Sequence, residues 1–118
     1  MSREAGARAE RLAEEFLRER GMRILARNFR TRFGEIDLVA QDGETVVFVE
    51  VRARSSDAFG TPQETVTVAK RRRIIRTARA YAQSRGLDAP LRFDVVALSP
   101  QGTLHIPGAF DATGAACP

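Results

Sequence analysis

The stretch from Gly34 to Arg54, GEIDLVAQDGETVVFVEVRAR, restricts the possible folds more than any other part of the sequence. Two runs rich in Val, Ile, Leu and Phe lie on either side of Asp42-Gly43. An Asp-Gly pair between apolar runs is a strong signal for a two-residue β-hairpin turn. The segment therefore predicts two antiparallel strands, and the rest of the domain must be built around them.

The hairpin register follows from the position of its turn. With Asp42-Gly43 as the turn, Glu35 lies opposite Glu50 and Phe48 lies opposite Asp37. Because side chains alternate faces along a strand, this register predicts one apolar face and one mixed face. The apolar face, which we expect in the core, comprises Ile36, Leu38, Ala40, Val47, Val49 and Val51.

The mixed face carries its charges at the end away from the turn, where Glu35, Asp37, Glu50 and Arg52 gather. Diagonal neighbours in a hairpin lie roughly 7 Å apart, so Asp37 and Glu50 could share one cation. Mg²⁺ suits such a site, because it takes one or two carboxylates and completes its shell with water and phosphate oxygens. A solvated outer face explains the same pattern, and the residues alone leave both interpretations open.

The remaining periodicity predicts one α/β domain with the element order αβββαββ and a mixed sheet flanked by helices. We expect this domain to span 1–110, with 111–118 as a flexible tail. The expected helices cover 3–20 and 68–85, and the expected strands cover 22–30, 33–40, 44–54, 91–99 and 103–110.

Composition excludes several classes of protein. The chain has 118 residues, 43% of them apolar, which favours one globular core. No apolar run approaches the ~20 residues of a membrane span, and charge from Arg3 onward argues against a secretory signal. The single cysteine, Cys117, predicts neither a disulfide nor a zinc site. We therefore expect a cytoplasmic protein without membrane contact.

Positive charge is concentrated in one segment. Residues 65–87 hold seven of the 19 basic residues and no acid, although the whole chain has a net charge of only +4. Such a patch attracts polyanions, which predicts a nucleic-acid partner. Helix-surface decoration for solubility is the alternative. The expected nucleic-acid contacts are Lys70, Arg71, Arg72, Arg73 and Arg76.

Beyond the hairpin, the sequence resembles a known family. The segments AERLAEEFLRERGMRILARNFRTRFGEIDLVA, VFVEVRAR, FGTPQETVTVAKRRRI, LRFDVV and HIPGAF follow the pattern of the YraN family of small, largely uncharacterised bacterial proteins. That family is similar to archaeal Holliday-junction resolvases and to the restriction-endonuclease-like, or PD-(D/E)XK, nucleases. Those nucleases share an Asp on one strand and Glu-x-Lys on the next, often with a Glu on the first helix.

The resemblance implies a metal-dependent, structure-selective DNA endonuclease. By position, Asp37, Glu50 and Glu10 match the motif acids, and Arg52 occupies the lysine position. These four residues would be catalytic, and Asp37, Glu50 and Glu35 would hold Mg²⁺ or Mn²⁺. Because related resolvases are dimers, the resemblance also implies a homodimer.

Arg52 departs from the motif, which has lysine there. Arginine stays protonated, so Arg52 can pair with Glu50 and stabilise phosphate charge, but it cannot serve as a general base. Two hypotheses follow: an active enzyme with a substituted lysine, or a module that binds nucleic acid without cutting it. A third hypothesis is a protein-interaction domain whose basic face meets an acidic partner.

Lys70 is the one lysine in this arginine-rich chain. One hypothesis is that it reaches the active-site phosphate and partly replaces the missing motif lysine. The alternatives are an ordinary phosphate-backbone contact and a solvated charge.

Two features elsewhere predict structural roles. Arg92 and Asp94 share one face of a strand, so we expect a simple ion pair. His105, the only histidine, lies between Leu104 and Ile106, a pattern more typical of a structural histidine than of a catalytic one.

Overall fold

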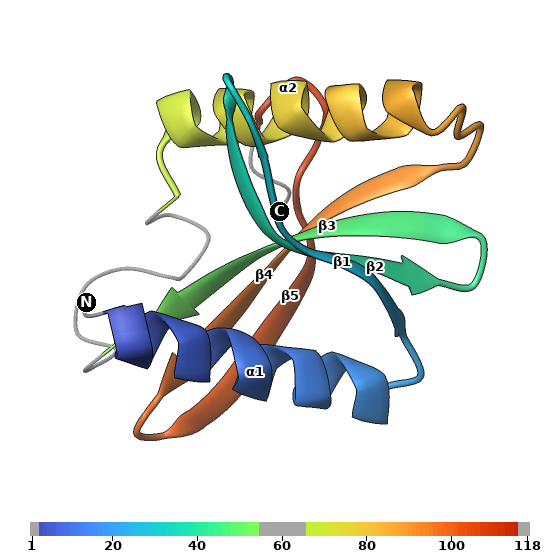
Figure 1. Cartoon of the computed structure of the whole chain (residues 1–118). Helices are drawn as coiled ribbons and strands as arrows, with labels where there is room; N and C mark the ends of the chain where they lie inside the picture. Colours follow the sequence, from blue (N-terminus) through green and yellow to red (C-terminus); the bar gives the residue numbers. More distant parts are fainter. Residues whose placement is uncertain (1–2, 55–65, 116–118) are drawn as a thin grey trace.

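The computed structural model describes residues 3–54 and 66–115 (Figure 1). The predicted order αβββαββ is confirmed. The expected loop at 55–65 and Cys117 lie outside the described residues. The elements are α1 (Arg3–Glu19), β1 (Arg23–Thr31), β2 (Gly34–Asp42), β3 (Thr45–Ala53), α2 (Val68–Ser84), β4 (Leu91–Ser99) and β5 (Gly102–Phe110).

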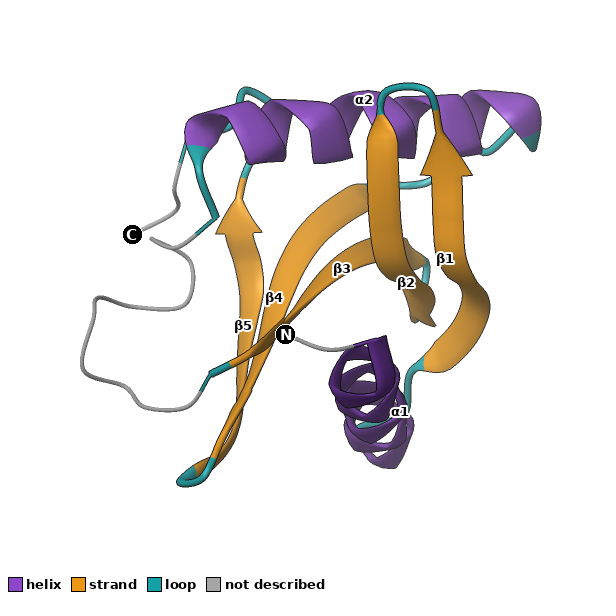
Figure 2. Cartoon of the chain, turned by 60° about the vertical axis from the view of Figure 1, so that its left-hand side comes forward, coloured by secondary structure: helices purple, strands orange, loops and turns teal. Residues whose placement is uncertain are grey.

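The five strands form one mixed sheet in the order β1-β2-β3-β4-β5. Strands β3 and β4 run parallel, and the other neighbouring pairs are antiparallel. Helix α2 lies between β3 and β4 in the sequence, as a parallel connection requires. Figure 2 shows α1 and α2 on opposite faces of the sheet, which confirms the predicted arrangement.

Each helix covers its own hydrophobic cluster. On the α1 side, Ala13 and Leu17 pack with apolar residues of β2, β3 and β4. On the α2 side, Ile74 and Tyr81 pack with Phe48 and their neighbours. Neither described helix is long and apolar enough to cross a membrane. The central strands β2, β3 and β4 are buried on both faces between the two helices, so polar side chains at their ends need specific partners.

The predicted hairpin turn is wrong by one residue. Asp42 pairs with Thr45, so Gly43-Glu44 is the turn. Gly43 adopts φ = 60°, a left-handed conformation that glycine takes at little cost, at the first of the two turn positions. The Asp42 side chain pairs with Arg92 of β4, which lies outside the hairpin. The Arg92 Nη1 is 3.0 Å from the Asp42 Oδ2.

This correction changes which side chains face each other. Val39, not Asp37, lies opposite Phe48. The predicted register, which placed Glu35 opposite Glu50, is therefore wrong. The observed pairing of β2 with β3 begins at Leu38, directly after Asp37.

One residue of the predicted apolar face lies on the other side. Leu38 packs in the α1-side cluster as expected, but Ile36 packs in the α2-side cluster. Asn28, with φ = 50°, lies between the β1 partners of these two residues. Regular alternation would keep Ile36 and Leu38 on one face, so β2 changes orientation at Asp37.

Candidate active site

A cavity of about 300 Å³ lies where α1, β2, β3 and α2 meet. Figure 1 shows the start of α1, the end of β3 and the start of α2 on the same side of the molecule. Among the residues that line the cavity are Glu10, Asp37, Glu50, Arg52 and Lys70. The fold therefore brings all four candidate catalytic residues and the single lysine to one place.

Asp37 is held by the neighbouring strand. Its Oδ2 accepts a hydrogen bond of 2.7 Å from the backbone N–H of Val51. Burial, and then the negative charges of Glu50 and Glu10, raise its pKa to about 7. The Val51 N–H and the Lys70 ammonium oppose this rise without cancelling it. Burial and the neighbouring acids therefore disfavour the charged form of Asp37 in the metal-free cavity.

Glu50 is the most deeply buried acid of the cavity, with a side chain 5% exposed. The Lys70 Nζ lies 2.6 Å from its Oε1. The Arg52 Nη1 lies 3.7 Å from the same oxygen. The lysine of α2 thus makes the shorter contact with Glu50, although Arg52 is only two residues away in the sequence.

The position of Lys70 follows from the start of α2. The Thr67 side chain caps the helix by accepting a hydrogen bond of 3.2 Å from the Lys70 N–H. Lys70 is therefore in the first turn of α2, from which its side chain reaches Glu50. The ammonium is partly exposed, with 37% of the side chain accessible.

Asn28 arranges the remaining acids. Its Nδ2 donates to the Oε1 of Glu10 at 2.9 Å and to the Oε1 of Glu35 at 3.1 Å. The other carboxylate oxygen of Glu35 lies 3.1 Å from the Arg30 Nε. Glu35 is thus held by β1 residues, whereas Glu10 also lines the cavity. Sequence reasoning missed Asn28, and the only available signal was that asparagine tolerates positive φ.

The donor set suits magnesium better than a metal that needs three side-chain ligands. Within 3–54 and 66–115, no three His, Cys, Asp or Glu side chains converge as a metal cluster. Asp37 and Glu50 nevertheless line one cavity, and repulsion from Glu50 contributes to the raised pKa of Asp37. Mg²⁺ needs only one or two carboxylates besides water and phosphate, so these residues fit it.

Of the five predicted basic contacts, three are exposed, whereas Lys70 is partly exposed and Arg71 is buried. Arg72, Arg73 and Arg76 are exposed on α2. Arg71 is only 8% exposed, donates from Nη1 to the Gly114 carbonyl at 3.2 Å, and is thus not on the surface. The burial of Arg71 could have been predicted from helical spacing. Position 71 lies one helical turn before the buried residues 74 and 75 and therefore on the same face of α2.

The basic face continues onto the turn between β1 and β2, which lies beside α2 in both views (Figures 1 and 2). The Arg76 guanidinium carbon lies 4.4 Å from the centroid of the Phe33 ring, and that of Arg32 lies 5.0 Å from it. A β-carbon on Gly34 would come within 3.3 Å of the Arg73 Cβ, which shows how closely the turn approaches the helix.

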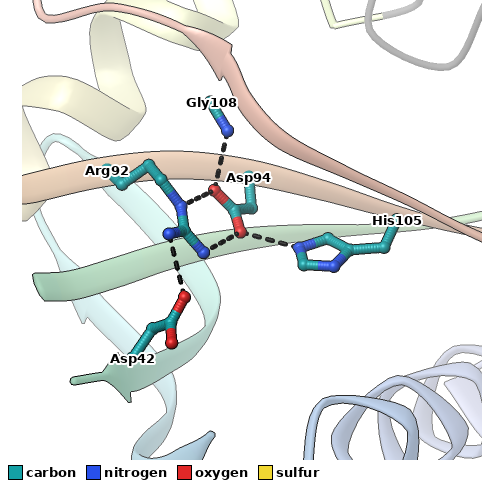
Figure 3. A network of polar contacts seen from close by, with 5 residues as sticks. All are labelled: Asp42, Arg92, Asp94, His105 and Gly108. Carbon is teal, nitrogen blue, oxygen red and sulfur yellow. Dashed lines mark hydrogen bonds and ion pairs between the residues drawn. The ribbon is translucent and has the colours of Figure 1, made fainter. Parts of the chain in front are cut away.

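A second polar cluster joins β2, β4 and β5 (Figure 3). Asp94, which is fully buried, accepts hydrogen bonds from Arg92 at 2.8 and 2.9 Å and from the Gly108 N–H at 3.0 Å. Its Oδ2 also lies 2.7 Å from the Nε2 of His105. The predicted Arg92–Asp94 pair is confirmed, but it belongs to a network that also includes Asp42.

Comparison with known proteins identifies the family. The model of "Uncharacterised protein family UPF0102" matches residues 9–98. The chain belongs to the UPF0102 family. This is the family also called YraN, so the resemblance noted from the sequence is confirmed at the family level.

Curated UPF0102 relatives match over most of their length. A UPF0102 protein of Anaeromyxobacter dehalogenans is 50% identical over 114 residues, which cover 92% of this chain and 85% of the relative. One of Symbiobacterium thermophilum is 52% identical over 101 residues, covering 85% of this chain and 86% of the relative. One of Persephonella marina is 45% identical over 107 residues, covering 90% and 92%.

Proposed function

We propose that this UPF0102 protein is a metal-dependent, structure-selective endonuclease that cleaves phosphodiester bonds in DNA. The observation that carries the proposal is the cavity where Asp37 and Glu50 lie together with Lys70. The raised pKa of Asp37 adds support, because strongly perturbed carboxylates in a cleft are frequent at catalytic sites. The resemblance to restriction-endonuclease-like enzymes supports the same reaction class.

Each residue has a definite role in this proposal. Asp37 and Glu50 hold Mg²⁺ or Mn²⁺, and Glu10 adds negative charge at the edge of the cavity. Once bound, the metal supplies charge stabilisation to the phosphate and lowers the pKa of a coordinated water. Arg52, which stays protonated, stabilises negative charge on the phosphate.

The reaction is hydrolysis. The oxygen of a water molecule bonds to phosphorus, and the bond from phosphorus to one sugar oxygen breaks. The attacking water loses a proton, and the leaving oxygen gains one. The products are an alcohol and a phosphate monoester, so the reaction needs no further reactant.

The exposed arginines of α2 would contact the DNA backbone. Replacing both Arg73 and Arg76 with Gln should weaken duplex binding and reduce the slope of log K against log salt by about 2, since each phosphate contact contributes about 1. Fluorescence anisotropy over a salt series measures this slope. The matched control is Arg23→Gln at the start of β1, which should leave the slope unchanged. An unaltered slope in the double variant would place the DNA elsewhere.

Cleavage itself tests the proposal. Mg²⁺ or Mn²⁺ is titrated into the wild type and Glu50→Gln with branched, single-stranded and duplex DNA. We expect the wild type to cut and Glu50→Gln or chelator to prevent cutting. Glu44→Gln, an exposed change at the turn of the same hairpin, should cut normally.

A second candidate function has one observation in its favour, namely Arg52 at the position of the motif lysine. It is a nucleic-acid-binding module without catalysis. Its signature is that the wild type cuts none of the three DNA forms, yet binds them equally well with and without chelator. That result would overturn the nuclease proposal. No binding at moderate salt would instead favour a protein-interaction domain.

A further inference from the structure

We infer that Lys70, supplied by helix α2, is the cation that acts on the scissile phosphate beside Glu50, in the role that other nucleases of this type give to a strand lysine. This inference rests on the proposed nuclease function and names a catalytic residue that the Glu-x-Lys pattern does not identify. Arg52, at the pattern's position, then has the lesser role of supporting the phosphate charge.

Geometry is the first support. The Lys70 Nζ lies 2.6 Å from the Glu50 Oε1, against 3.7 Å for the Arg52 Nη1. Glu50 is buried and both cations line the cavity. The shorter contact therefore brings the ammonium, rather than the guanidinium, to the carboxylate that would hold the metal.

The second argument is that helix α2 holds Lys70 in a fixed position. Lys70 is in the first turn of α2, where its N–H is bonded to the cap residue Thr67. One turn further along, Ile74 packs in the α2-side core. A functional side chain is positioned more accurately on a packed helix than on a loop. The packing of α2 therefore fixes the backbone of Lys70 relative to Glu50.

Chemistry is the third support. A lysine ammonium has three donors on one compact nitrogen, so contact with Glu50 leaves it able to donate to a phosphate oxygen and to the attacking water. A guanidinium holds its donors in a rigid planar fork, so their directions are fixed relative to one another and adjust less readily to a phosphate oxygen and a water at the same time. The ammonium can therefore stabilise the charge that develops at phosphorus while it remains beside Glu50.

A purely structural role for Lys70 makes a different prediction. A buried carboxylate such as Glu50 needs a counter-ion, and any cation of similar reach would serve. Lys70→Arg keeps the charge and would then leave cleavage intact. If the ammonium itself contacts the phosphate, Lys70→Arg loses cleavage while the protein stays folded.

The test uses single-turnover cleavage with saturating enzyme, so that weaker DNA binding does not affect the rate. Lys70→Met should slow cleavage by about 10²–10³-fold, the usual cost of removing one donor that stabilises developing charge. Lys70→Arg should lose at least about tenfold, and the double change Lys70→Met with Arg52→Lys should recover part of the rate. Arg23→Met removes an exposed charge at the start of β1, outside α2, and should cleave at the wild-type rate.

Metal affinity provides a readout independent of cleavage. Without DNA, the ammonium competes with a cation for Glu50, so Lys70→Met should bind Mn²⁺ about threefold or more tightly, by calorimetry, than the wild type. Lys70→Arg, which keeps the charge, should bind Mn²⁺ as the wild type does. Circular dichroism checks that each variant is folded. If Lys70→Met does not fold, the cleavage rate of Lys70→Arg decides the test.

The outcomes separate the two proposals. A wild type that cuts no DNA in Mg²⁺ or Mn²⁺ refutes the nuclease and, with it, the phosphate role of Lys70. A wild type that cuts, with Lys70→Arg cutting equally fast, leaves the nuclease in place and overturns the assignment of Lys70. Unchanged Mn²⁺ affinity in folded Lys70→Met also overturns it, because the ammonium would then not share Glu50 with the metal.

Discussion

Replacing Asp37 with asparagine should make the metal-free protein more stable at pH 8 while abolishing cleavage. The pKa of Asp37 is raised from 3.8 to about 7, by burial first and then by Glu50 and Glu10. Between these two pH values the folded state binds more protons than the unfolded state, so stability falls as pH rises. Above about pH 7 the charged carboxylate destabilises the fold by up to about 4 kcal/mol, because each pKa unit of the shift corresponds to about 1.4 kcal/mol, and the neutral amide avoids this cost.

Urea unfolding in chelator, from pH 5 to pH 9, measures this effect. The wild-type free energy of unfolding should decline from pH 5 through about pH 7 and then level off, and the Asp37→Asn curve should be flatter and higher at pH 8. The asparagine oxygen can still accept the Val51 N–H, so packing is preserved. Asp88→Asn, on the exposed surface, is the matched control and should follow the wild type. If the free energy of unfolding varies with pH in the same way for the wild type and Asp37→Asn, the charged Asp37 carboxylate does not destabilise the fold.

Replacing Asp94 with alanine should have the largest effect on stability, a loss of about 3–5 kcal/mol. The change leaves Arg92, His105 and the Gly108 N–H without the carboxylate that all of them contact. Denaturant unfolding at pH 7 measures the loss. Asp42→Ala, which removes the partly exposed member of the same network, should cost less than about 1 kcal/mol. Similar losses for both variants would show that burial of Asp94 is not the cause.

The pH dependence of the Asp94 network has the opposite sign from that of Asp37. Burial alone would raise the Asp94 pKa, but hydrogen bonds from His105, Arg92 and Gly108 outweigh it and hold the pKa below its usual value of 3.8. Its stabilisation is therefore fully present above about pH 4 and is lost as pH falls through the lowered pKa. Acid unfolding of the wild type should include this loss, and Asp94→Asn should lack it.

The hairpin shows what local sequence can and cannot determine. Alternation placed Leu38, Val47 and Val49 on one core face correctly, because a period of two depends only on the strand itself. The register was wrong because glycine suits either position of a two-residue turn. In the structure Asp42 pairs with Arg92 of β4, fifty positions away, and no local pattern reports such a contact.

The candidate site shows the same division. Asp37 and Glu50 were predictable because they are carried by adjacent strands, and Glu10 because the resemblance supplied it. The contact between Lys70 and Glu50 depends on where α2 crosses the sheet, so the sequence could pose it only as a hypothesis. Asn28 gave no signal strong enough to predict its left-handed backbone or the change of face at Asp37.

The parallel crossover from β3 to β4 also determines when the cavity is completed during folding. The hairpin brings Asp37 and Glu50 together through contacts close in sequence, and such contacts form early. Lys70 arrives only when α2 has packed on the sheet, a step that joins residues further apart in the sequence than the hairpin does. A chain still emerging from the ribosome would thus carry the acids of the cavity without this cation until α2 is in place.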